Sequence, residues 1–114
     1  LVTLHPDPNL EQSFGEINYA ISMATIECHF WMNNMFWNDD NWILNNIEPI
    51  KDIPTFIAHG RYDVDCRAIG AWELSKKLNN CELEFLVCGH SSGEPEIIDA
   101  LVRATDKFKE VLKK

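Results

Sequence analysis

Two short apolar segments, each followed by a helical pattern, constrain the fold of this chain most. Residues 53–60 (IPTFIAHG) form a nearly continuous apolar run and predict a buried strand, and residues 82–88 predict a second strand. Helical periodicity follows over residues 68–78 and 94–113. This alternating order predicts a parallel sheet with right-handed crossovers. Because two strands alone leave both edges of a parallel sheet open, we interpret this half as the end of a larger α/β domain.

The first half of the chain carries a different pattern. Apolar residues recur at helical spacing from about residue 8 to residue 35. The apolar surface of this predicted helix is so wide that we expect it to be covered on more than one side. Asparagines and aspartates at residues 38–41 interrupt the pattern, and a second helix is predicted over residues 42–47. The sequence therefore predicts helices followed by an α/β segment.

The charge balance excludes several classes of partner. The 114 residues carry 10 basic and 18 acidic side chains, which gives a formal net charge of −8 at pH 7. Nucleic acids and anionic membranes both require a basic face, so we expect neither as a partner. No apolar run approaches the roughly 18 residues that a membrane span needs. The chain begins at Leu1 without a signal-like segment, so we expect a processed or truncated polypeptide.

The cysteines indicate a reducing compartment. They form no CxxC pair, and their spacing suits neither a zinc site nor a compact disulfide framework. We therefore expect free thiols in a cytoplasmic protein. The four are Cys28, Cys66, Cys81 and Cys88.

Two polar residues follow the two predicted strands. Asp63 comes shortly after the first strand, and His90 comes shortly after the second. Sites in parallel α/β sheets lie at the carboxyl ends of strands. Taken singly, Asp63 could be a turn or capping residue, and His90 could have no chemical role. Together they match the last two members of the Ser…Asp…His order of α/β-hydrolases.

A literal Gly-x-Ser-x-Gly pattern lies between the second strand and the last helix. Residues 89–93 read GHSSG, with Ser91 at the position of a nucleophile. In that chain order an acid and a histidine must follow the nucleophile, and no histidine follows Ser91. We therefore expect that Ser91 is not a nucleophile.

Glu27 is unusual because it lies among apolar residues of the first predicted helix. Burying a carboxylate is costly unless it is paired. Glu27 could face solvent or an arginine, or it could lie in an aromatic pocket that receives a cation. His29, His59 and the cysteines have no spacing typical of metal ligands, so we expect no metal site.

Longer motifs cover nearly the whole chain. They are residues 5–8 (HPDP), 24–30 (ATIECHF), 59–66 (HGRYDVDC), 71–74 (AWEL), 89–91 (GHS), 94–95 (EP) and 99–106 (DALVRATD). Together they closely resemble the C-terminal part of proline iminopeptidases. These are α/β-hydrolases with a helical cap over the site, and they release an N-terminal proline from peptides through a serine nucleophile. The resemblance implies that residues 1–50 are the end of the cap and residues 51–114 the C-terminal part of the hydrolase core.

The resemblance also implies roles for single residues. Asp63 would be the acid of the catalytic triad, and His90 would be the general base. Glu27 would bind the imino group of the substrate, and Trp31 would lie near the proline ring. A protonated secondary amine would then supply the charge partner of Glu27. No metal or organic cofactor is implied.

The resemblance places the serine, the oxyanion donors and a second cap carboxylate before Leu1. We therefore expect the chain to be inactive alone and to associate with itself or with the missing N-terminal part. Two residues depart from the family pattern: Arg67 replaces a proline, and Asp65 replaces an apolar residue. Two other functions stay open. One is a non-catalytic hydrolase-like binding protein, and the other is a capped hydrolase that acts on esters, amides or epoxides.

Overall fold

The computed structural model describes residues 2–112 and divides them into two compact units. Residues 6–45 form a helical unit, and residues 2–5 together with 46–112 form a unit that contains the sheet. In the described part of the chain, no helix is long and apolar enough to cross a membrane.

The helical unit begins with two consecutive helices rather than one. Its elements are α1 (Pro8–Phe14), α2 (Ile17–Met32), η1 (Asn34–Phe36) and α3 (Trp42–Asn45). The single helix predicted for residues 8–35 is therefore wrong. Gly15 ends α1, and its N–H donates to the carbonyl oxygens of Glu11 and Gln12. Glycine has the lowest helix propensity apart from proline, so a break at this position is physically reasonable.

Helix α2 has no buried residue within this chain. Large apolar side chains along it are exposed, including Ile21, Ile26 and Trp31. The chain then turns sharply through three left-handed residues, Asn34 to Phe36, with φ between 49° and 59°. This turn brings Phe36 against Phe30, with ring centroids 5.5 Å apart.

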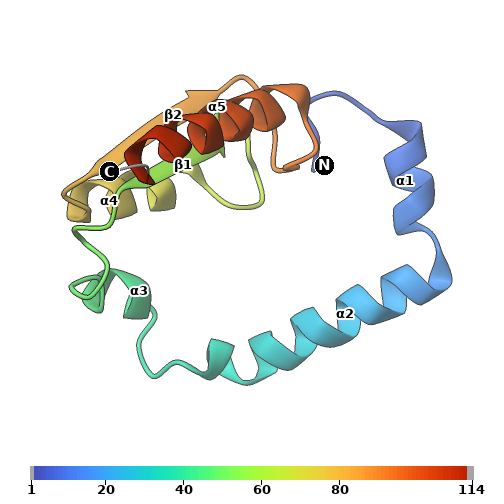
Figure 1. The fold of residues 1–114 in the computed structure, drawn as a ribbon. Helices are drawn as coiled ribbons and strands as arrows, with labels where there is room; N and C mark the ends of the chain where they lie inside the picture. The colour runs from blue at the N-terminus through green and yellow to red at the C-terminus, as the bar shows by residue number, and fades with distance from the viewer. Residues whose placement is uncertain (1, 113–114) are drawn as a thin grey trace. The chain divides into compact units, whose positions relative to one another are not determined.

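The second unit contains a parallel pair of strands, which confirms the predicted sheet. Strands β1 (Thr55–Gly60) and β2 (Cys81–Leu86) pair in parallel from Thr55↔Cys81 to Gly60↔Leu86. Helix α4 (Ala68–Lys77) connects them, and α5 (Pro95–Leu112) follows β2. Both helices contact both strands. In Figure 1, α5 lies in front of the strand pair and α4 behind it, so the two helices cover opposite faces.

The core of this unit is small. Strand β1 was predicted to be fully buried, but only Gly60 is buried and the other residues of the strand are half-buried. The physical reason is that the sheet has only two strands within residues 2–112, so their outer edges and part of each face stay open. Helix α5 supplies most of the core through positions three or four residues apart, which share one helix face. The buried apolar residues are Leu78, Cys88, Ile97, Ala100 and Ala104.

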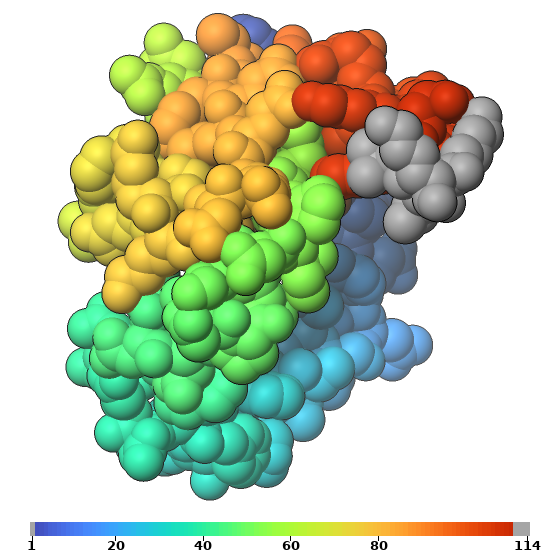
Figure 2. Space-filling model, turned by 60° about the vertical axis from the view of Figure 1, so that its left-hand side comes forward, coloured from blue at the N-terminus to red at the C-terminus, as the bar shows by residue number. Residues whose placement is uncertain are grey.

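Hydrogen bonds at the start of the strands set their register. The Lys51 carbonyl accepts from the Asn79 N–H at 2.8 Å, and the Asp52 carboxylate accepts from the Asn79 side-chain amide at 2.6 Å. The Thr55 N–H donates to the Asn80 carbonyl at 2.9 Å. Figure 2 shows the green segment before β1 against the orange start of β2. With their amino ends held level, the two strands also end level at the opposite edge.

Candidate active site

The loops that follow β1 and β2 meet at the carboxyl edge of the sheet. The strand register pairs Gly60 with Leu86, so both loops leave the sheet at the same level. The Arg61 N–H donates to the Leu86 carbonyl at 2.7 Å, and the Tyr62 N–H donates to the Cys88 carbonyl at 3.0 Å. These bonds join the two loops by their main chains.

The two loops pack so closely that Gly60 has no room for a side chain. A Cβ atom at this position would lie 1.8 Å from the Gly89 carbonyl oxygen and 2.8 Å from that of Cys88. Both neighbours are main-chain atoms, which cannot rotate away. Glycine at position 60 is therefore a condition for the close approach of the two loops.

Asp63 and His90 form a hydrogen-bonded pair at this edge. His90 Nδ1 lies 3.0 Å from Asp63 Oδ2. The Asp63 side chain is 5% exposed and the His90 side chain is 37% exposed. The other carboxylate oxygen, Oδ1, accepts from the N–H groups of Asp65 at 2.9 Å and Cys66 at 2.8 Å. The main chain thus holds the carboxylate and directs its second oxygen at the imidazole.

The surroundings of Asp63 favour its ionised form. Burial acts to raise its pKa, but the hydrogen bonds from His90 and from the N–H groups of Cys66 and Asp65 outweigh burial. The pKa of Asp63 therefore lies below its ordinary value. An ionised carboxylate at Nδ1 favours the His90 tautomer with its proton on Nδ1. That tautomer leaves a lone pair on Nε2, which is what a general base needs.

Two more side chains border the pair, and sequence reasoning gave neither of them a role in this site. His59 Nε2 lies 3.9 Å from Asp63 Oδ2, the same oxygen that His90 approaches. Asp65 Oδ2 lies 3.7 Å from His90 Nε2, and the Asp65 side chain is 66% exposed. The available signals were the place of His59 at the end of a predicted strand and the unusual acid at position 65. Among residues 2–112, no group of three or more His, Cys, Asp or Glu side chains is arranged to hold a metal ion.

Glu27 and Trp31, the other two predicted site residues, lie on α2 in the helical unit. They are four positions apart, so they share a helix face. Both are exposed within this chain. Beside Trp31 is a hollow of about 260 Å³ that combines aromatic rings with carboxylates, a lining that suits a cation. Its lining residues are Trp31, Asn34, Met35, Trp37, Asp39 and Asp40.

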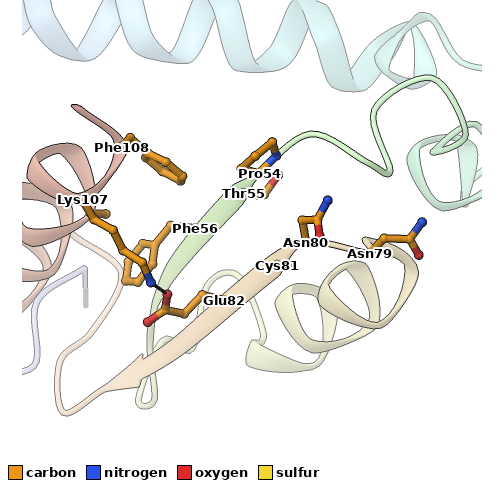
Figure 3. A pocket seen from close by; sticks show the side chains of 10 residues that line it. Pro54, Thr55, Phe56, Asn79, Asn80, Cys81, Glu82, Lys107 and Phe108 are labelled. Carbon is orange, nitrogen blue, oxygen red and sulfur yellow. Dashed lines mark hydrogen bonds and ion pairs between the residues drawn. The ribbon is translucent and has the colours of Figure 1, made fainter. Parts of the chain in front are cut away.

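A larger hollow, of about 320 Å³, lies at the opposite end of the strands from Asp63 and His90. Figure 3 shows Phe56 and Phe108 beside it and the Lys107 ammonium paired with Glu82. Its charged groups are thus already bound to each other. The acid–base pair at the carboxyl edge is the better candidate for an active site.

A buried acid hydrogen-bonded to a histidine, each after one of two neighbouring parallel strands, is typical of hydrolytic enzymes with an α/β fold. No protein-family model matches the chain. Individual curated proteins do match it. A probable proline iminopeptidase of Leptolyngbya boryana is 43% identical over 103 residues, which cover 90% of this chain and 32% of that protein. The proline iminopeptidase of Xanthomonas citri is 41% identical, over 92% of this chain and 34% of that protein.

A plant protein is similar to the chain over the same region. The proline iminopeptidase of Arabidopsis thaliana is 36% identical over 98% of this chain and 30% of its own length. These similarities confirm the resemblance to proline iminopeptidases. The chain spans about a third of the length of the curated relatives that it matches.

Proposed function

We propose that this chain supplies the acid and the base of a proline iminopeptidase-type serine peptidase. Residues 1–50 would be the end of the helical cap, and residues 51–114 the C-terminal part of an α/β-hydrolase core. The observation that carries the proposal is the 3.0 Å contact between His90 Nδ1 and the buried Asp63 carboxylate. The names of the related proteins support the reaction class. The four free cysteines support a cytoplasmic location.

In the proposed mechanism, His90 transfers the proton. Its Nε2 takes the proton from a serine hydroxyl that another part of a longer protein provides, as the serine oxygen attacks the prolyl carbonyl. The same nitrogen then gives the proton to the leaving amine. Asp63 keeps the imidazole in the required tautomer and stabilises the imidazolium that forms. In the second half of the reaction, Nε2 takes a proton from water as the water oxygen attacks the prolyl–serine ester. The same nitrogen then returns the proton to the serine oxygen as proline leaves.

Ser91 is not the nucleophile in this proposal. It lies in the connection between β2 and α5, directly after His90. Its Oγ accepts a hydrogen bond from the Gly93 N–H at 3.2 Å, as in a local serine turn. A nucleophile elbow instead requires a sharp turn straight from a strand into a helix.

Glu27 and Trp31 would recognise the substrate. A free N-terminal proline carries a protonated secondary amine and an apolar ring. The Glu27 carboxylate would bind the amine by a charge-assisted hydrogen bond, and the Trp31 ring would contact the pyrrolidine. Their common face on α2 and the hollow beside Trp31 support this assignment.

The test is hydrolysis of a prolyl arylamide by the longer polypeptide that carries this sequence. Asp63→Asn and His90→Gln should each lower kcat/KM by a factor of about 10³–10⁴. Asp99→Asn, which alters an exposed acid on α5, is the matched control and should stay within about twofold of wild type. Unchanged turnover in Asp63→Asn would contradict the triad assignment.

A second variant tests whether Glu27 binds the free amine of the substrate. Glu27→Gln should lower kcat/KM for the prolyl arylamide by about tenfold to a hundredfold, mainly through KM, because a charged hydrogen bond is lost. Turnover of an N-acetylprolyl ester, which has no free amine, should not change. If wild type hydrolyses esters or epoxides but not prolyl arylamides, the related capped hydrolase is the correct reading. If it binds ligands without turnover, the protein is a non-catalytic binding protein.

A further inference from the structure

A buried carboxylate that the proposed mechanism does not use lies just behind His90. Glu94 is 8% exposed and ends the connection between β2 and α5. Its Oε1 accepts from the Gly89 N–H at 2.7 Å, and its Oε2 accepts from the Leu4 N–H at 2.9 Å. The carboxylate thereby joins the loop that carries His90 (residues 87–94, the His90 loop) to the first residues of the chain.

Residues 2–5, which we call the strap, also hold the His90 loop by their main chain. The Val2 carbonyl accepts from the N–H groups of His90 at 2.8 Å and Ser91 at 2.7 Å. There is little free space between the two segments. A Cβ atom on Gly89 would lie 2.9 Å from the Leu4 nitrogen and 3.1 Å from Glu94 Oε1.

The N–H groups of three consecutive residues, 89 to 91, are therefore all bound, the first by Glu94 and the next two by the strap. The main chain of His90 is fixed on both sides of its Cα atom. The position of its imidazole then depends mainly on the side-chain torsions. A hydrogen bond that a backbone N–H donates to a carboxylate is charge-assisted and stronger than a neutral one, so Glu94 holds both segments firmly.

We infer that Glu94 is a positioning residue, which acts with the strap to hold His90 at hydrogen-bond distance from Asp63. The positioning itself can be tested in this chain, and only its effect on turnover rests on the proposed function. Both donors that reach Glu94 are N–H groups, so the site requires an acceptor at each oxygen. Glutamine would offer one acceptor and would turn an NH₂ group toward the other N–H.

The first measurement is nuclear magnetic resonance of the chain with ¹⁵N-labelled histidine. The His90 Nδ1–H proton is identified by its loss in His90→Gln, and its exchange with water reports the bond to Asp63. Glu94→Gln should accelerate this exchange by at least about tenfold, because the imidazole leaves Asp63 more often. Glu96→Gln removes the same charge at an exposed position two residues later and should leave the exchange unchanged.

A structural role alone would give a different result. Ile97→Val weakens the buried face of α5 and leaves the Glu94 carboxylate and its two N–H donors unchanged, so it serves as a control for lost stability. If Ile97→Val accelerates the exchange as much as Glu94→Gln does, Glu94 only stabilises the fold and the inference is wrong. The same conclusion follows if the exchange in Glu94→Gln stays within twofold of that in Glu96→Gln.

Leu4→Pro tests the contact between Glu94 and the strap from the strap side, because proline lacks the N–H that donates to Glu94 Oε2. Alone it should accelerate the His90 exchange. In the Leu4→Pro background, Glu94→Gln should accelerate the exchange by at most half as much as it does in wild type, since glutamine then needs to accept from the Gly89 N–H only. If Glu94→Gln does not fold, Leu4→Pro decides: unchanged exchange overturns the inference, and faster exchange supports it.

Turnover provides a separate readout in the longer polypeptide. There Glu94→Gln should lower kcat and leave KM for a prolyl arylamide nearly unchanged, because Glu94 acts through the position of His90 and has no part in substrate binding in the proposed function. A wild-type protein without this activity would contradict the proposed function but not the positioning role, which the exchange rates decide.

Discussion

His90 Nδ1 lies 3.0 Å from Asp63 Oδ2, although 27 positions separate the two residues in the chain. The parallel register accounts for this proximity, because β1 and β2 are direct neighbours and end at the same level. Gly60 then permits the loops to touch, and Glu94 with the strap holds the second loop in place. Two neighbouring parallel strands thus bring the acid and the base to the same edge, and the contacts of their loops hold them there.

The Asp63 carboxylate should make stability depend on acidic pH. Because its folded-state pKa lies below the ordinary value of 3.8, ionised Asp63 stabilises the fold. That contribution is complete above the unfolded pKa and is lost as pH falls through the folded pKa. Asp63→Asn should therefore lower the free energy of unfolding by about 1–3 kcal/mol at pH 6. The difference from wild type should shrink below about pH 4. Urea unfolding followed by circular dichroism measures it, and a difference that is constant from neutral to strongly acidic pH would argue against this role.

Two glycine variants should change stability in opposite directions. Gly60→Ala places a methyl group against the Gly89 carbonyl and should destabilise the chain by about 3 kcal/mol or more. Gly70 lies in α4, and apart from its chain neighbours and the nearby backbone of the helix no atom lies within 4 Å of a Cβ at this position, so Gly70→Ala should stabilise the chain by about 0.5–1 kcal/mol. Thermal unfolding of both variants checks this pair. A tolerated Gly60→Ala would show that the two loops are not in contact.

Ser91 should not react with a serine-directed fluorophosphonate in this chain. Its hydroxyl belongs to a local turn, and it follows His90 directly rather than lying opposite the His90 Nε2 atom on another loop. Intact mass spectrometry should show no adduct, with Ser91→Ala as the matched control. A stoichiometric adduct that maps to Ser91 would mean that the chain has its own nucleophile.

Thiol alkylation should follow the surroundings of each cysteine. Cys28 is exposed and should react first. Burial of the Cys66 thiol and the nearby charges of Asp63 and Asp65 raise its pKa, so Cys66 should react more slowly. Cys88 is fully buried and its pKa is also raised, first by burial and then by acidic neighbours. It should react at least about tenfold more slowly than Cys28 at pH 8.

Peptide mapping after timed alkylation gives these rates, and alkylation in urea provides the reference in which all four thiols are accessible. Equal rates at Cys28 and Cys88 without denaturant would contradict the packing of the His90 loop against the sheet.

Local sequence patterns predicted most of the second unit. The helix predicted for residues 68–78 agrees with α4, and the parallel order of the two strands is confirmed. Both depend on the periodicity of apolar residues, which a short window of sequence contains. The same reasoning missed the break between α1 and α2, because a single glycine within a long apolar pattern is a weak local signal.

By itself, the sequence determined where the strands and most helices lie and that Asp63 and His90 each follow a strand. It also carried the motifs by which the chain resembles proline iminopeptidases. Only the tertiary structure decided that the two residues meet, that Gly60 must lack a side chain, and that Glu94 binds the Leu4 N–H. Glu94 and Leu4 are 90 positions apart. A contact across that distance depends on how loops close and pack, and no local periodicity encodes it.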